Sequence, residues 1–297
     1  MPEATPAGSE AAGREPFGAR LAAAMIARGP LCVGIDPHPA LLKDWGLNDD
    51  VEGLRRFSLT ALEAVSSLAA AVKPQVALYE RHGSAGMAVL EEVLASVGDA
   101  DVLSIADAKR GDIGSTMAAY ADAWLRDGSS LAADSVTLSP YLGFESLRPA
   151  LDLAVQYGRG VFVLALTSNP EGASVQHVGA DDSVARRITE AAAAENSRVA
   201  ALLPSAVNTL GSVGLVVGAT VGAAVERLQL DLAAMAGPIL APGLGAQGGT
   251  ARDMRETFGS AYPQVLGTSS REILAAGPDP RGLQDAALRT VDLLRID

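Results

Sequence analysis

Eight short stretches of the chain are almost continuously apolar and rich in β-branched residues. Such stretches are typical of parallel strands that are buried on both faces of a sheet. Each one precedes a longer stretch, rich in Ala and Leu, with the period of a helix, for example residues 117–128 and 182–203. The apolar stretches cover residues 31–36, 72–79, 101–109, 135–140, 160–168, 214–220, 238–243 and 262–269.

This alternation predicts an α/β protein with a parallel sheet and right-handed crossovers. Eight strand–helix units favour a closed (β/α)8 TIM barrel over an open sheet. Residues 17–30 form an additional apolar-periodic stretch, which we expect to be a helix that covers the bottom of the barrel. No linker divides the rest, so we predict a single barrel domain over residues 17–297 after a flexible leader, rich in Ala, Pro, Gly and Glu, over residues 1–16.

The composition narrows the possible partners. The 297 residues are 48% apolar, which allows a large core, and carry a net charge of −12. An acidic surface argues against nucleic acid or an anionic membrane as partner, but not against a small anionic substrate. Cys32 is the one cysteine, so no intramolecular disulfide is possible, and we expect it to be a small apolar residue inside a strand.

We expect neither a targeting segment nor a membrane segment in this sequence. The leader lacks the basic start and apolar block of a signal peptide. Residues 214–225 are apolar but too few and too rich in Gly to span a bilayer. We therefore predict a cytoplasmic protein.

Polar residues follow the apolar stretches where a barrel would place its chemistry, at the carboxyl ends of the strands. Polar residues must appear wherever a buried strand ends, so this pattern supports a site there without deciding its function. These residues are Asp36, Lys73, Asp107, Lys109, Ser139, Ser168, Gln247 and Arg271.

The strongest cluster of charge follows the third apolar stretch. Asp107 and Lys109 are two residues apart on a predicted strand, so both should point into the mouth of the barrel. Asp112 lies three residues further on, after Gly111 allows a turn. One Asp–Lys pair alone would suggest a structural ion pair. Three charged groups spaced D-x-K-x-x-D indicate instead a site that positions and tunes a lysine as proton donor.

Residues 243–248 satisfy the dinucleotide-binding pattern G-x-G-x-x-G. The context disfavours a Rossmann site, because the motif lies in the seventh unit and residues 267–269 lack the acidic partner expected about 20 residues later. Barrel enzymes often bind phosphate with the loops after the seventh and eighth strands. Gln247 and Arg271 could donate hydrogen bonds there, so we favour a phosphate site.

Residues 107–113, with the sequence DAKRGDI, resemble the signature D-x-K-R-x-D-I of the orotidine 5′-phosphate decarboxylase family. Further similarities to that family follow in order along the chain, and residues 72–75 are similar to its longer bacterial members. The loop at residues 241–249 departs from the family in beginning with Ala241, where Thr or Ser is common. The other similar segments are residues 34–37, 166–170 and 269–271, and the resemblance runs from about Phe17 to the end of the chain.

The resemblance implies conversion of orotidine 5′-phosphate to UMP and CO2 in de novo pyrimidine biosynthesis, with no cofactor. Lys109 would stabilise the carbanion at C6 and protonate it. The catalytic set would be an alternating chain of charges formed by Lys73, Asp107, Lys109 and Asp112.

The resemblance also implies how the substrate is bound. Asp36 and Lys73 would hold the ribose hydroxyls, Ser168 would contact the pyrimidine, and Pro242 would line its apolar side. Asp112, Ile113 and Thr116 would reach into the partner's site in a homodimer with shared active sites. The phosphate would be bound at the ends of the seventh and eighth units by Gln247, Ser270 and Arg271.

Two alternatives remain from the sequence. The first is a Mg²⁺-dependent sugar-phosphate enzyme such as a hexulose-phosphate synthase, although Lys73 stands where such a site needs an acidic ligand. The second is a protein that only binds a phosphorylated ligand. The three histidines have no metal-ligand spacing, so we expect no metal site, and His38 is a candidate to border the active site.

Overall fold

The computed structural model describes residues 13–100, 102–202, 210–244 and 250–295. Eight parallel strands pair in sequence order, and β8 pairs with β1, so the sheet is a closed barrel. This confirms the predicted (β/α)8 TIM barrel. The strands are β1 (Leu31–Ile35), β2 (Ala71–Pro74), β3 (Leu103–Arg110), β4 (Ser135–Leu138), β5 (Gly160–Leu166), β6 (Val213–Val217), β7 (Ile239–Pro242) and β8 (Val265–Ser269).

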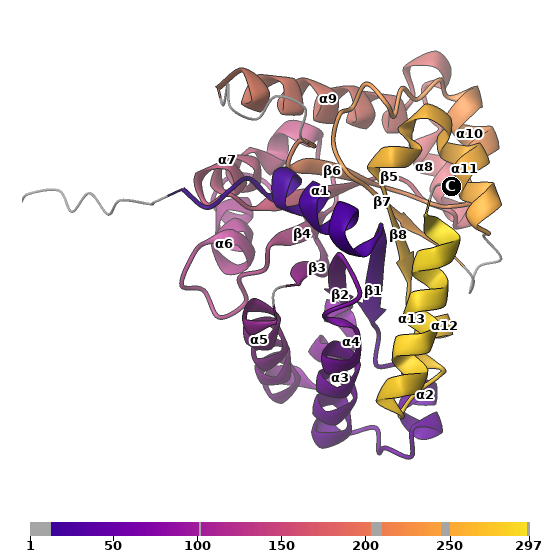
Figure 1. Cartoon of the computed structure of the whole chain (residues 1–297). Coiled ribbons are helices and arrows are strands. Elements are labelled where there is room, and N and C mark those ends of the chain that lie inside the picture. The colour runs from indigo at the N-terminus through magenta and orange to yellow at the C-terminus, as the bar shows by residue number, and fades with distance from the viewer. Residues whose placement is uncertain (1–12, 101, 203–209, 245–249, 296–297) are drawn as a thin grey trace, which may run out of the picture.

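Helices follow each strand and surround the barrel (Figure 1). The longer ones pack an apolar face on the strands, as the helical period of the sequence predicts. The α-helices are α1 (Phe17–Arg28), α2 (Pro39–Asp44), α3 (Val51–Val65), α4 (Val76–Glu80), α5 (Gly83–Asp99), α6 (Gly114–Leu125), α7 (Arg148–Gln156), α8 (Ala173–Gln176), α9 (Val184–Leu202), α10 (Gly222–Arg227), α11 (Ala251–Phe258), α12 (Arg271–Leu274) and α13 (Pro280–Leu294). Short 3-10 helices are η1 (Phe144–Leu147), η2 (Pro170–Gly172), η3 (Ala180–Asp182) and η5 (Gly259–Gln264).

Two of the apolar stretches contain part of a helix as well as a strand. The second stretch leaves the sheet after Pro74 and continues as helix α4, which buries Val76 and Tyr79. Those two residues are three apart, and three-residue spacing inside a continuous apolar stretch does not distinguish a strand from a helix. The eighth stretch begins inside η5, so β8 starts only at Val265.

Helix α1 closes the barrel at the amino ends of the strands, as expected. Phe17 is fully buried and packs edge-on against Phe162 of β5, with the ring centroids 6.0 Å apart. Gly160 leaves the room for this ring, because a Cβ there would lie 2.2 Å from an atom of Phe17. Phe17 and Leu21 join the cluster of side chains inside the barrel, which also contains Cys32 in β1. Cys32 is therefore a buried strand residue, as predicted.

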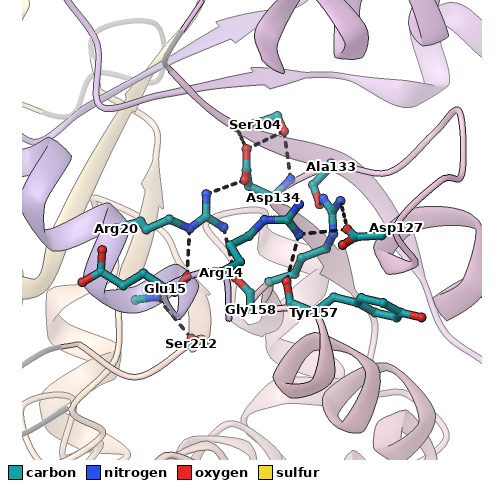
Figure 2. A network of polar contacts seen from close by, with 12 residues as sticks. Arg14, Glu15, Arg20, Ser104, Asp127, Ala133, Asp134, Tyr157, Gly158 and Ser212 are labelled. Atoms are coloured by element: carbon teal, nitrogen blue, oxygen red, sulfur yellow. Dashed lines mark hydrogen bonds and ion pairs between the residues drawn. The ribbon is translucent and has the colours of Figure 1, made fainter. Parts of the chain in front are cut away.

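A polar network ties the start of the chain to the barrel (Figure 2). Arg20 in α1 donates to Asp134 at 2.6 Å, and the other oxygen of Asp134 accepts from the backbone N–H and hydroxyl of Ser104. Arg14, which precedes α1, donates to Asp127 and to the carbonyl of Tyr157, both at 2.9 Å. Of the predicted leader, residues 1–12 lie outside the described residues, so its flexibility stays a prediction.

Among the described helices, none combines the length and the apolar character needed to cross a membrane.

We expect Phe17→Ala to lower the free energy of unfolding by about 3–5 kcal/mol, because it empties space at the base of the barrel. Urea unfolding followed by circular dichroism measures this change. Ile26→Ala is the matched control, since Ile26 lies on the same helix but is 87% exposed. Equal losses for the two variants would contradict the closing role of Phe17.

Candidate functional site

A cavity of about 420 Å³ opens at the carboxyl ends of the strands. Eight of the residues predicted from the sequence line it, and they come from six of the eight strand–helix units. These residues are Asp36, Lys73, Asp107, Lys109, Ser168, Pro242, Ser270 and Arg271. The site that the barrel rule predicts is therefore formed within one chain, with the exceptions given below.

The centre of the cavity wall is the carboxylate of Asp107, which lies between two ammonium groups. Lys73 Nζ is 2.9 Å from Asp107 Oδ2, and Lys109 Nζ is 2.6 Å from Asp107 Oδ1. Asp107 and Lys73 have side chains only 9% and 7% exposed, whereas that of Lys109 is 45% exposed. All three side chains line the cavity, but Lys109 is the most exposed of them, while Lys73 and Asp107 are largely buried in the cavity wall.

Two neutral side chains complete the contacts of Asp107. The Gln75 amide donates to Oδ2 at 2.9 Å, and the Thr137 hydroxyl donates to Oδ1 at 2.9 Å. Each carboxylate oxygen therefore accepts from one ammonium and one neutral donor. This arrangement fixes the plane of the carboxylate and compensates the cost of burying its charge.

Attraction between the charges of this cluster shifts the pKa values of Asp107 and Lys73 in the direction opposite to the shift that burial alone would cause. Burial by itself would raise the pKa of Asp107, but the charges of Lys73 and Lys109 hold that pKa well below its usual range. Burial would likewise lower the pKa of Lys73, yet the attraction of Asp107 and then of Asp36 raises it above its ordinary value. Both groups are therefore charged across the neutral pH range.

Asp36, at the end of β1, is held from one side only. Its Oδ2 accepts from the Ser270 hydroxyl at 2.6 Å, while its buried Oδ1 has no hydrogen-bond partner among the described residues. Gly34 makes this pair possible, because a Cβ there would lie 2.0 Å from the Ser270 hydroxyl oxygen. The free oxygen is an acceptor available to a ligand hydroxyl.

The opposite part of the cavity is formed by the loops after β7 and β8. Pro242, Gly243 and Leu244 line it together with Arg271. Gly243 has φ +112°, a conformation that favours glycine. Gln247 lies outside the described residues, so its predicted contact stays a prediction.

The structure does not bring every predicted residue to the cavity of its own chain. Asp112 accepts a hydrogen bond from the N–H of Ile113 at 2.7 Å and does not line the cavity. Ile113 and Thr116, at the start of α6, are exposed. Ser139 also lies outside the lining. Within one protomer, the predicted chain of four charges therefore contains only Lys73, Asp107 and Lys109.

Sequence reasoning did not single out Gln75, which lines the cavity, or Thr137, which lies behind it. His38, the candidate to border the active site, does line the cavity. The sequence signal for Gln75 was its position two residues after Lys73, because alternate residues share a face at a strand end. Thr137 gave no such signal, since a hydroxyl inside an apolar strand is common.

Within the described parts of the chain, no group of three or more His, Cys, Asp or Glu side chains could hold a metal ion.

The fold and the cavity define a parallel (β/α)8-barrel protein whose site combines a Lys–Asp–Lys cluster with an anion-compatible loop region. The model of the orotidine 5′-phosphate decarboxylase / HUMPS family matches residues 29–285. The chain belongs to this family.

Individual relatives agree with that assignment over nearly the whole chain. An orotidine 5′-phosphate decarboxylase of Salinispora arenicola is 55% identical over 277 residues, which are 93% of this chain and 96% of the relative. A crystal structure from Streptomyces avermitilis, assigned as the same enzyme, has 51% identity and a TM-score of 0.88, covering 99% of this chain and 98% of that one. The Leishmania donovani OMP decarboxylase has 29% identity and a TM-score of 0.71, covering 94% and 98% of the respective chains.

Cys32 adds a pH-dependent contribution to stability inside the same barrel. Burial, the main cause, raises the pKa of its thiol from 9.0 to about 12, and the positive charge of Lys73 only partly opposes this. Above pH 9 the unfolded thiol ionises while the native thiol does not. The contribution of Cys32 to the free energy of unfolding is therefore fully present below pH 9. It is lost as the pH rises from 9 toward 12, by about 1.4 kcal/mol per pH unit.

Between pH 7.5 and pH 10.5, we expect the free energy of unfolding of the wild type to fall by about 2 kcal/mol more than that of Cys32→Ala, which has no thiol to ionise. Urea unfolding at both pH values measures this difference. As a control for burial, iodoacetamide should label the thiol at pH 8 only in denaturant. A difference that does not change with pH would contradict the assignment.

Proposed function

We propose that this protein decarboxylates orotidine 5′-phosphate to UMP without a cofactor, in de novo pyrimidine biosynthesis. The observation that carries the proposal is the buried carboxylate of Asp107 between the ammonium groups of Lys73 and Lys109. Membership of the family over residues 29–285 supports the same reaction.

The cavity offers a complementary group for each part of such a substrate. Asp36 would accept a ribose hydroxyl through Oδ1, which has no partner in the described part of the chain, and Lys73 would donate to the ribose. Ser168 would contact the pyrimidine, whose apolar side would lie against Pro242. The phosphate would lie beside Ser270 and Arg271, where Gln247 is expected to complete its contacts.

In the proposed reaction the bond between C6 and the carboxylate carbon breaks, CO2 leaves, and the electron pair stays on C6. The ammonium of Lys109 stabilises this charge, donates a proton to C6 and regains one from water. Asp107, fixed near the departing carboxylate, would repel it in the ground state. Proton transfer typically contributes about 10²–10⁴-fold, so the preorganised charges and the binding of the remote phosphate must contribute the rest.

A Mg²⁺-dependent sugar-phosphate enzyme on the same scaffold is the second candidate. Magnesium sites use carboxylate oxygens with free lone pairs. Here both oxygens of Asp107 already accept hydrogen bonds, two of them from lysine ammonium groups. This favours the metal-free reaction.

We further propose a homodimer with shared active sites in the cytoplasm, without a nucleic-acid or membrane partner. Three large apolar residues are exposed after β3 and β4: Ile113 at 61%, Tyr141 at 80% and Leu142 at 54%. The two loops touch, since a Cβ on Gly111 would lie 2.2 Å from the carbonyl oxygen of Ser139. In this arrangement Asp112, Ile113 and Thr116 would reach into the cavity of the partner.

We expect Lys109→Ala to lower turnover of orotidine 5′-phosphate by at least about 10⁴-fold, because it removes both the proton donor and the charge that stabilises C6. UMP should still raise the melting temperature of this variant. The loss of substrate absorbance in buffer with EDTA measures turnover, and thermal unfolding measures binding. Lys43→Ala is the control, because Lys43 is exposed on α2. Strict dependence of the wild type on Mg²⁺ would favour the second candidate. UMP stabilisation of a wild type without turnover would indicate a binding protein.

Shared sites also predict complementation between inactive variants. Lys109→Ala and Asp112→Ala should each be inactive alone, because each removes one side of every site. Mixing them under conditions that exchange subunits should restore about a quarter of wild-type activity, since half the dimers carry one intact site. Activity that stays at the level of the separate variants would show that each site belongs to one chain.

A further inference from the structure

Strand β3 contains an irregularity at the point where it carries Asp107 and Lys109. Ala106 lies opposite Val136 of β4, and Arg110 lies opposite Leu138. The three residues 107–109 therefore lie opposite Thr137 alone. Such a bulge re-aims the side chains that it carries and is common beside active sites.

The hydroxyl group of Thr137 forms hydrogen bonds with the first and the last residue of this bulge, Asp107 and Lys109. The backbone N–H of Lys109 donates to Thr137 Oγ1 at 2.9 Å, and the same hydroxyl donates to Asp107 Oδ1 at 2.9 Å. The direction of both hydrogen bonds is determined, because an N–H can only donate and an ionised carboxylate can only accept. The hydroxyl therefore connects the carboxylate of Asp107 directly to the backbone of Lys109.

The backbone of Lys109 needs such support. Its φ is +50°, in the left-handed region that disfavours residues with a Cβ. Backbone of this kind persists where surrounding contacts enforce it, often at functional sites. Thr137 is 1% exposed and does not line the cavity, so it does not meet a ligand there.

We infer that Thr137 is a positioning residue for the reaction at Lys109, an inference that rests on the proposed function. Its hydroxyl holds the Lys109 backbone in the left-handed conformation and turns Asp107 Oδ1 toward Lys109 Nζ, 2.6 Å away. Without it, the ammonium loses its fixed direction, while the groups that face the ribose and the phosphate stay in place. The loss should therefore fall on the chemical step and not on binding.

The test compares two substitutions of Thr137. Thr137→Val keeps the shape and removes the hydroxyl, and it should lower kcat by about 10- to 100-fold, the range that follows small misplacements of reacting groups. KM and the affinity for UMP, measured by calorimetry, should stay within about threefold of wild type, since the binding groups are unchanged. Thr137→Ser restores the hydroxyl and should recover most of kcat.

Thr290→Val is the matched control. Thr290 is also a buried hydroxyl, bonded to the carbonyl of Ala286 in the outer helix α13, and its loss should leave kcat unchanged. The inference is overturned if Thr137→Val keeps wild-type kcat, if it weakens UMP binding as much as kcat, or if Thr137→Ser is as slow as Thr137→Val. A wild type that does not decarboxylate orotidine 5′-phosphate overturns the proposed function and this role together. Wild-type turnover combined with an unaffected Thr137→Val overturns this role alone.

Discussion

The burial of one negative charge governs the site. A carboxylate out of water is costly unless charged and polar partners replace its hydration. Asp107 meets that requirement with four donors, the ammonium groups of Lys73 and Lys109, the amide of Gln75 and the hydroxyl of Thr137. Because each oxygen accepts two hydrogen bonds, the carboxylate has a fixed plane, and the ammonium groups beside it have fixed positions. Charges that are fixed before a substrate arrives need no reorganisation during a reaction.

The closed barrel is what brings these donors together. Lys73 and Gln75 come from the end of β2, Asp107 and Lys109 from β3, and Thr137 from β4. These strands are neighbours in the sheet, so segments far apart in the sequence meet at one point of the rim. The remaining parts of the cavity follow the same rule, with Asp36 after β1 beside Ser270 after β8. The order of the strands thus determines which side chains can cooperate.

The fold and the charged residues of the site were predictable because both follow from burial. Continuous apolar stretches can only be buried strands or helices, and the charges of Lys73, Asp107 and Lys109 must lie where those strands end. The bulge at residues 107–109 was not predictable, since periodicity assumes a regular strand. Thr137 was missed for a related reason, because its role depends on that bulge. Helix α4 was missed because Val76 and Tyr79 continue an apolar stretch that fits a strand equally well.

The position of Phe17 has a consequence for the order in which the molecule can assemble. Helix α1 is the first described element to leave the ribosome, yet its buried face packs on Phe162 of β5, nearly half the chain later. The barrel that it seals closes only when β8 pairs with β1. During synthesis the apolar face of α1 therefore stays exposed until the segments that cover it have been translated. Contacts so distant in sequence slow folding, and the nascent chain exposes an aggregation-prone apolar surface until translation has passed Ser269.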